Sequence, residues 1–369
     1  MITRTIFDQE HDLFRTSVRK FSDDNIAPYL EQWDERGAVD RELWNKLGEQ
    51  GFLCTTMPEQ YGGAGGDRRF GMIMLEELAP LGGLGLSVSM HSDIVAPYLL
   101  RYGSASVKQK YLPSMAAGES IGALAMSEPA AGSDVKAIRT SAVRAGADYI
   151  LNGSKTFISN GYECGLAVVV AKTDPAAGAR GISLFLVDDK MPGFEKGKKL
   201  KKVGMRAQDT AELFFNDVRV PGENLLGTEN QGFIHLMEEL PWERLQIGIC
   251  AVACAQAAFQ NTVDYTKERQ VFGQAVADFQ NTRFKLAEMK SQIQIGQVFV
   301  DRCMELLMEN QLDTDTASMA KYWCSDLQCN VVDECVQLHG GYGFMSEYAV
   351  ARAWTDARAQ RIYGGTNEL

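Results

Sequence analysis

Residues 148–159 read "DYILNGSKTFIS", a run rich in β-branched and aromatic residues. Three further runs of this kind follow, "GLAVVVAKT" (165–173), "GISLFLVDD" (181–189) and "TAELFFNDVRVP" (210–221), and turn-forming residues separate them. Short β-rich runs divided by turns are typical of an antiparallel β-domain. We therefore expect residues 119–225 to form such a domain.

Helical patterns lie on both sides of this β-rich part. Before it come segments such as "RRFGMIMLEELAPLG" (68–82), and after it come three long segments rich in alanine, beginning at about residues 242, 281 and 315. Their apolar residues extend beyond one narrow face, as in helices buried in a bundle or at a subunit interface. The order predicts an α+β protein with three domains, at 1–118, 119–225 and 226–369.

A doubly wound nucleotide-binding fold is not expected from this pattern. Strands and helices do not alternate, and no GxGxxG motif follows a strand and opens a helix. The chain has 37 Lys and Arg against 48 Asp and Glu, so its net charge of -11 disfavours a surface that binds nucleic acid.

The eight cysteines form no CxxC pair and the four histidines lie far apart, so we expect reduced thiols and no metal site. The N-terminal sequence "MITRTIFDQEHDLFRTSVRKF" has helical spacing and no signal-peptide pattern. The strongest apolar run, at 165–171, is too short to cross a bilayer. These features predict a cytoplasmic protein without a membrane span.

Five motifs give the chain a likeness to a known family: "MSEPAAGSDV" (126–135), "LNGSKTFISNG" (151–161), "RQVFGQAVADFQ" (269–280), "QLHGGYGF" (337–344) and "IYGGTNE" (362–368). In order and spacing the chain resembles the acyl-CoA dehydrogenases over nearly its whole length. The resemblance implies an N-terminal helical domain, a central β-domain and a C-terminal four-helix bundle. It also implies a homotetramer that shares FAD between subunits.

The resemblance assigns flavin contacts to positions in the β-domain and in the C-terminal domain. Small hydroxyls can hydrogen-bond the edge of a flavin, an aromatic ring can cover its face, and an arginine fork suits a diphosphate. The matching positions are Leu124, Met126, Ser127, Ser133, Phe157, Ile158, Ser159, Arg269, Phe272, Gln280, Gln337, Leu338, His339, Gly340, Gly341, Thr366, Asn367 and Glu368.

The catalytic base is the point at which this chain departs from the usual family pattern. Most members have a glutamate after the tyrosine of the last motif, whereas here Gly364 follows Tyr363. The long-chain and isovaleryl branches carry the base in an "ERL" motif, and "ELPWERL" (239–245) places Glu243 there. By spacing alone, Glu243 is an ordinary first-turn acid of a helix that Pro241 begins. The helix end would lower its pKa and an apolar pocket would raise it.

The implied reaction removes the α-proton of an acyl-CoA through Glu243 while the β-hydride passes to flavin N5, giving a trans-2-enoyl-CoA. Electrons then pass to an electron-transferring flavoprotein. The long-chain branch is the more similar one, which favours a medium-to-long acyl chain. Substrate positions implied by the resemblance are Ser133, Ala179, Arg180, Ile234, Pro241, Trp242, Arg244, Gly364 and Gly365. The family also continues into a short helix beyond the position of Leu369.

Three other functions stay open at this point. A branched-chain acyl-CoA dehydrogenase and an acyl-CoA oxidase that uses O2 share these motifs. An inactive acyl-CoA-binding protein would explain Gly364, although the presence of Glu243 argues against it.

Overall fold

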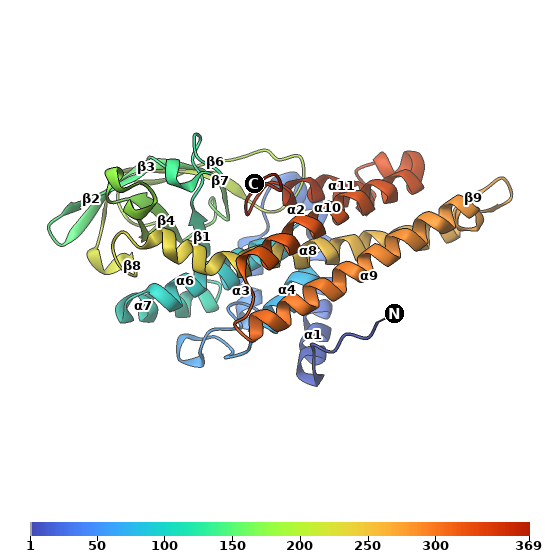
Figure 1. Ribbon diagram of the computed structural model, residues 1–369, viewed down its shortest axis with the longest axis horizontal. Coiled ribbons are helices and arrows are strands. Elements are labelled where there is room, and N and C mark those ends of the chain that lie inside the picture. Colours follow the sequence, from blue (N-terminus) through green and yellow to red (C-terminus); the bar gives the residue numbers. More distant parts are fainter. Residues whose placement is uncertain (1) are drawn as a thin grey trace.

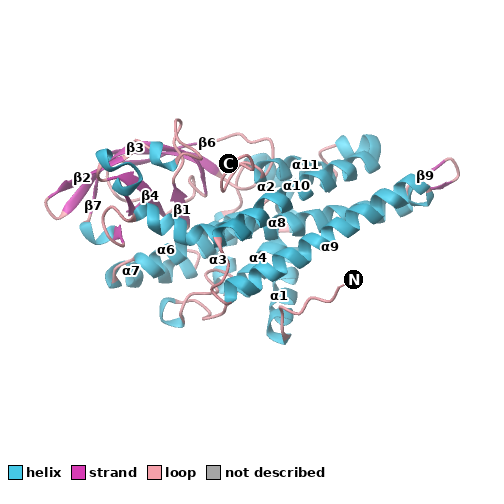
Figure 2. Ribbon diagram, viewed as in Figure 1, coloured by secondary structure: helices cyan, strands magenta, loops and turns pink. Residues whose placement is uncertain are grey.

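The computed structural model describes residues 2–369 and has three parts in the order helices, sheet, helices. Figure 1 shows the sheet at one end of the molecule, with the two longest helices running away from it. Figure 2 shows the same division by secondary structure. The α+β architecture expected from the sequence is confirmed.

The first part is a set of helices around a shared apolar core. Its helices are α1 (Gln9–Asn25), α2 (Leu30–Arg36), α3 (Arg41–Glu49), α4 (Arg68–Leu78), α5 (Leu84–Ser89), the π-helical turn η3 (Met90–Val95), α6 (Ala96–Tyr102) and α7 (Ala105–Ala116). Side-chain caps begin several of them: Asp8 accepts backbone N–H bonds at α1, Asp67 at α4 and Ser104 at α7. Such caps satisfy N–H groups that have no partner within the helix.

The second part is a sheet in the order β6-β7-β3-β2-β4-β5-β8, with β1 beside β4. The strands are β1 (Gly122–Ala125), β2 (Ser141–Ala145), β3 (Asp148–Ser159), β4 (Leu166–Lys172), β5 (Ile182–Asp188), β6 (Phe194–Lys199), β7 (Thr210–Val220) and β8 (Leu225–Leu226). Most pairs are antiparallel, as expected, but β1 and β2 pair with β4 in parallel. Neither β1 nor β2 is joined to β4 by a hairpin, since β3 comes between them and β4 in the chain.

Strand β4 is buried on both faces, which explains its continuous apolar sequence. Val168 and Val170 belong to the core of the N-terminal helices, while Val169 and Ala171 belong to a separate core within the β-domain. The sheet is therefore fixed directly on the helical part.

The third part contains α8 (Gly232–Glu268), α9 (Gln280–Met308), α10 (Thr314–His339) and α11 (Ala349–Gln360). A hairpin of β9 (Gln270–Val271) and β10 (Gln274–Ala275) joins α8 to α9 at the end far from the sheet (Figure 1). In the described chain, residues 2–369, we find no helix with both the length and the apolar composition needed to cross a membrane.

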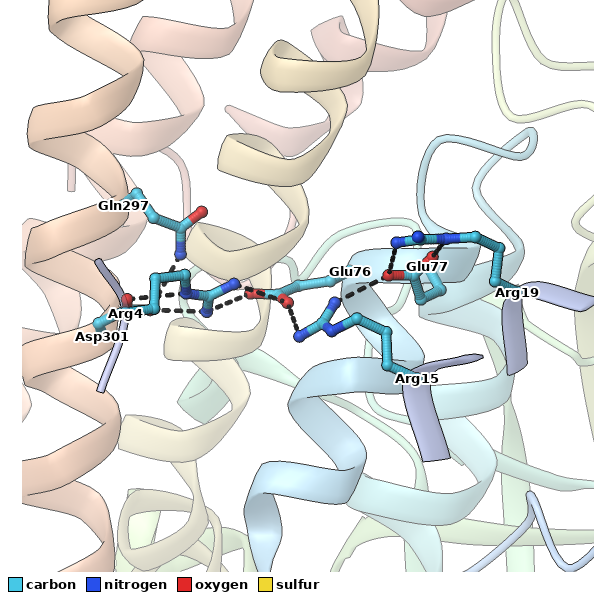
Figure 3. Close-up of polar contacts among 7 residues, drawn as sticks. All are labelled: Arg4, Arg15, Arg19, Glu76, Glu77, Gln297 and Asp301. Carbon is cyan, nitrogen blue, oxygen red and sulfur yellow. Dashed lines mark hydrogen bonds and ion pairs between the residues drawn. The ribbon is translucent and has the colours of Figure 1, made fainter. Parts of the chain in front are cut away.

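An ion-pair network joins the N-terminal segment to the third part (Figure 3). Arg4 donates to Glu76 on α4 at 2.7 Å and to Asp301 on α9 at 2.7 Å. Arg15 on α1 continues the network to Glu76 and Glu77. Arg4 makes two hydrogen bonds to each of its carboxylates, and together with Arg15 it fixes how α1, α4 and α9 pack together.

Candidate active site

Glu243 lies well inside α8, not at its beginning. The helix starts at Gly232, so the expectation that Pro241 opens it is wrong. Pro241 has no N–H for the carbonyl of Met237, and the helix continues through this position. Glu243 therefore lies beyond the first turn, and the positive end of the helix dipole does not set its pKa.

The carboxylate of Glu243 is held by a tyrosine from the N-terminal domain. The hydroxyl of Tyr98 on α6 donates to Glu243 Oε1 at 3.0 Å. Loss of solvent around the carboxylate raises its pKa to about 7, against a lowering by the Tyr98 hydrogen bond. A carboxyl group with such a pKa is suited to accept a proton near neutral pH.

Trp242, which precedes Glu243 on α8, is anchored by the π-helical turn η3. Its indole N–H donates to the carbonyl of Asp93 at 3.1 Å, and the guanidinium of Arg68 lies over its ring. Only 3% of Trp242 is exposed. Its ring therefore has a fixed place beside the base, whereas Ile234, two turns earlier, is 49% exposed.

The C-terminal segment closes over the same turn of α8. Arg244 donates to the Gly364 carbonyl at 3.3 Å and to Ser318 on α10 at 2.7 Å. Lys321 on α10 donates to the Gly365 carbonyl and to Asn367 Oδ1, both at 2.6 Å. The structure thus brings Gly364 and Gly365 to the turn of the helix that carries Glu243.

The β-domain positions expected to contact flavin meet at an irregularity in β3. The register with β7 shifts between Lys155 and Ile158, and Phe157 has a positive φ of 59°. Phe157 is consequently turned outward and is 71% exposed. Thr156 N–H donates to the Ser127 carbonyl at 3.0 Å, which joins the two expected segments. Ile158 is buried, so only its backbone is available to a ligand.

A buried ion pair supports this irregularity. Lys155 Nζ donates to Glu128 Oε1 at 2.9 Å and to the Met126 carbonyl at 2.9 Å. Glu128 in turn accepts the backbone N–H groups of Arg139 and Thr140 at 2.6 and 2.9 Å. The sequence analysis did not single out this pair, although both residues lie within the quoted motifs.

A second group of expected flavin positions surrounds a cavity of about 480 Å³ near the β9–β10 hairpin. Its lining includes Arg269, Gln337, Leu338, His339, Gly340 and Gly341. His339 is a structural residue whose ring stacks on Tyr265 and hydrogen-bonds the Cys335 carbonyl at 2.8 Å. Nothing lies within 4 Å of the positions where Gly340 and Gly341 would carry a Cβ. The backbone of this turn is therefore open to a ligand, and Phe272 nearby is 98% exposed.

The two groups lie far apart in one chain. Arg269 follows Glu243 along α8 by about 39 Å at 1.5 Å per residue, and Figure 1 shows the β9 hairpin and the sheet at opposite ends. Gln280 lies with the distant group, at the start of α9.

Thr366, Asn367 and Glu368 lie between the two groups, and Asn367 hydrogen-bonds Ser325 and Asp326 on α10. Ala179 and Arg180 lie on the short 3-10 helix η5 (Pro175–Gly181) beside the sheet.

Family models match three successive parts of the chain: the acyl-CoA dehydrogenase N-terminal domain at residues 8–119, the middle domain at 123–218 and the C-terminal domain at 230–369. The chain belongs to the acyl-CoA dehydrogenase family. It is 52% identical over 368 residues to the mitochondrial long-chain specific acyl-CoA dehydrogenase of Rattus norvegicus, covering 99% of this chain and 86% of that one.

Solved structures of acyl-CoA dehydrogenases have the same fold. The acyl-CoA dehydrogenase of Geobacillus kaustophilus is 46% identical with a TM-score of 0.97, covering 99% of this chain and 97% of that chain. A glutaryl-CoA dehydrogenase of Mycobacterium smegmatis in complex with FADH2 is 31% identical with a TM-score of 0.92, covering 98% and 92%. This acyl-CoA dehydrogenase is thus a flavoprotein oxidoreductase that uses FAD.

The residues present fit that cofactor. The distant cavity offers a guanidinium and an open glycine turn, and both suit a diphosphate. The β-domain offers the exposed aromatic ring of Phe157, and the segments of Ser127 and Ser159 meet there through the Thr156 N–H bond to the Ser127 carbonyl. Tyr98 and Lys321 are further residues that the sequence analysis missed. Tyr98, Arg101 and Tyr102 share one face of α6 toward acids of α8, a relation that no local sequence signal shows.

Proposed function

We propose that this protein catalyses the α,β-dehydrogenation of a medium-to-long-chain acyl-CoA to the trans-2-enoyl-CoA, with Glu243 as the catalytic base. The observation that carries the proposal is the placement of Glu243. Its carboxylate is fixed by Tyr98 at 3.0 Å and lies on the turn of α8 that contacts Gly364 through Arg244. The 52% identity to a long-chain specific enzyme supports the substrate class.

In the proposed mechanism, Glu243 removes the α-proton of the thioester. Tyr98 keeps one carboxylate oxygen occupied by its hydroxyl, so the other oxygen is left for the proton. The raised pKa of about 7 makes the carboxylate a stronger base than a solvated glutamate. FAD, when bound, supplies the acceptor for the β-hydride. The backbone N–H of Gly364 is the proposed hydrogen-bond donor to the thioester oxygen as negative charge develops on it.

Arginines near the site are suited to the phosphates of CoA. Arg244 is held by Ser318 and the Gly364 carbonyl, both neutral groups, so its charge is available to an anion. Arg180 is exposed at the end of η5, beside Ala179. Ser133 is exposed near the β-domain contacts and is the proposed shared contact of substrate and flavin. Ile234, Pro241 and Trp242 are the proposed acyl-chain contacts.

The separation of the two flavin groups supports cofactor sharing in a homotetramer. Phe157 and Ser159 would hold the flavin ring of one active site, while Arg269, Phe272 and Gln337 of a neighbouring copy would hold the diphosphate and adenosine. Exposed apolar residues on the long helices, such as Phe284, Ile295 and Trp323, are consistent with burial between copies. An electron-transferring flavoprotein is the proposed electron acceptor.

Anaerobic stopped-flow reduction of the flavin by acyl-CoA tests the base directly. Glu243→Gln should leave the protein yellow and able to bind acyl-CoA, but reduce its flavin at least about 10²-fold more slowly. Glu268→Gln, at the exposed end of the same helix, serves as the matched control and should behave as wild type. Reduction of the Glu243→Gln flavin at the wild-type rate would refute the assignment. Rapid turnover with O2 alone would identify an oxidase.

Arg269→Ala tests the second half of the flavin site. It should weaken FAD retention because the distant cavity loses its guanidinium. Arg302→Ala, on the exposed face of α9, is the control. An unchanged FAD affinity of Arg269→Ala would count against the proposed role of Arg269.

A panel of acyl-CoA substrates of increasing chain length, assayed with electron-transferring flavoprotein as the electron acceptor, determines the preferred acyl group.

A further inference from the structure

Helix α6 presents three polar side chains to three carboxylates of α8. Tyr98 bonds the base Glu243, and one turn later Arg101 donates to Glu239 at 2.8 Å. Tyr102 donates to Glu238 at 2.6 Å, and Arg101 is also 3.1 Å from that carboxylate. The contacts follow helical spacing on both elements, so the pairing belongs to the packing of the two helices.

Glu239 is the member of this set that acts on the base. It lies one turn before Glu243 on the same face of α8 and is only 5% exposed. A negative charge there opposes a second negative charge on Glu243 and raises its pKa. Arg101 is the cation bonded to Glu239, and Tyr102 adds a weaker hydrogen bond at 3.3 Å.

Other charged groups also lie near this pair. Arg68 and Asp93 line a cavity of about 250 Å³ together with Arg101, Glu239 and Trp242. The guanidinium of Arg68 lies over Trp242 and is attracted by the charges of Glu239 and Asp93. Arg244, the next residue along α8, also acts on Glu243 and lowers its pKa.

We propose that Arg101 is a positioning residue for the reaction, which neutralises Glu239 so that Glu243 can act as an anionic base. Arg101 touches neither the base nor, by its place on α6, the reacting carbons. It acts through Glu239. This inference rests on the proposed role of Glu243 and extends it to a second helix. It also gives a reason for an arginine to be placed against a nearly buried acid one turn from the catalytic residue.

The experiment measures the rate of flavin reduction as a function of pH in the intact flavoprotein, with saturating acyl-CoA and without oxygen. The variants are Arg101→Met, Glu239→Gln and the double variant. Arg101→Met leaves the charge of Glu239 without its partner, so the acid limb of the profile should move to higher pH by on the order of one unit. Glu239→Gln should move the limb to lower pH, because it removes the negative charge that opposes ionisation of Glu243.

The double variant separates this role from a structural one. It has neither charge, so its acid limb should return close to that of wild type, even if its stability is lower. Equal acid limbs in wild type, Arg101→Met and Glu239→Gln would overturn the proposal. If Arg101→Met does not retain flavin, the direction of the Glu239→Gln shift decides alone. Failure of the base assignment itself appears separately, as wild-type reduction by Glu243→Gln.

Discussion

The Cδ1 atom of Ile247 occupies the space into which a β-carbon on Gly364 would project. Ile247 lies one turn after Glu243 on α8, and Gly364 has a φ of 66°, a conformation that favours glycine. A side chain at this position, where most of the family has its catalytic glutamate, would need a strained φ and a shift of the Ile247 side chain. The helix that carries the base, α8, and the glycine of the C-terminal segment therefore pack directly against each other through Ile247.

Gly364→Ala should destabilise the protein by about 2–3 kcal/mol, from the strained φ and from overpacking against Ile247. Chemical denaturation with flavin fluorescence measures this. Ile247→Val removes the obstructing Cδ1 at a cost of about 1 kcal/mol. The double variant should lose less than the sum of the two single variants. Strict additivity would show that the two residues do not compete for the same space.

Glu243→Gln should stabilise the substrate-free protein at pH 8 and have little effect at pH 4.5. The pKa of Glu243 is raised from 4.5 to about 7 in the folded state, so ionising it costs stability as pH rises through this range, and the cost is complete above pH 7. At about 1.4 kcal/mol per pKa unit, reduced for partial exposure, we expect about 2 kcal/mol at pH 8. Thermal unfolding at the two pH values checks this, and a pH-independent effect would contradict it.

Lys155→Met should cost about 3–5 kcal/mol and lower the FAD content, because it leaves the buried carboxylate of Glu128 without its cation. The Lys155 and Glu128 pair holds the irregular turn of β3 that presents Phe157. Absorbance of the purified protein gives the FAD content. Lys196→Met removes a more exposed pair with Asp189 in the same domain and should cost less than about 1 kcal/mol. If Lys155→Met kept its full FAD content, the ion pair of Lys155 and Glu128 would not be needed to hold the flavin-binding turn of β3.

The order of domains and most strands was predictable because short β-rich runs divided by turns and long alanine-rich helices have strong local signals. Strand β3 has the bounds of the quoted run, Asp148–Ser159. The parallel pairing of β1 was not predictable, because it depends on where the chain leaves the helices. The start of α8 was missed because proline normally marks a first turn, whereas Pro241 lies inside the helix.

The base could be found from the ERL motif, but its surroundings could not. Tyr98 is 145 positions from Glu243 in sequence, and only the packing of α6 on α8 joins them. Burial, which decides the direction of the Glu243 pKa shift, is likewise a tertiary property.

Lys321→Met should loosen the C-terminal segment that carries Gly364 and Gly365. Lys321 is the donor to the Gly365 carbonyl and to Asn367, and its loss leaves both acceptors without this partner. Bonds from a charged donor contribute about 1.5–3 kcal/mol, so hydrogen exchange in 362–369 should accelerate by roughly tenfold or more. Lys290→Met, which removes a bond to Gln256 between α8 and α9, is the control and should leave that segment unchanged. Since the segment contacts Arg244, the KM for acyl-CoA should rise while the acid limb of the pH profile of flavin reduction stays in place.

Unchanged hydrogen exchange in residues 362–369 would contradict this prediction. It would mean that Asn367, through its bonds to Ser325 and Asp326, holds the segment without Lys321.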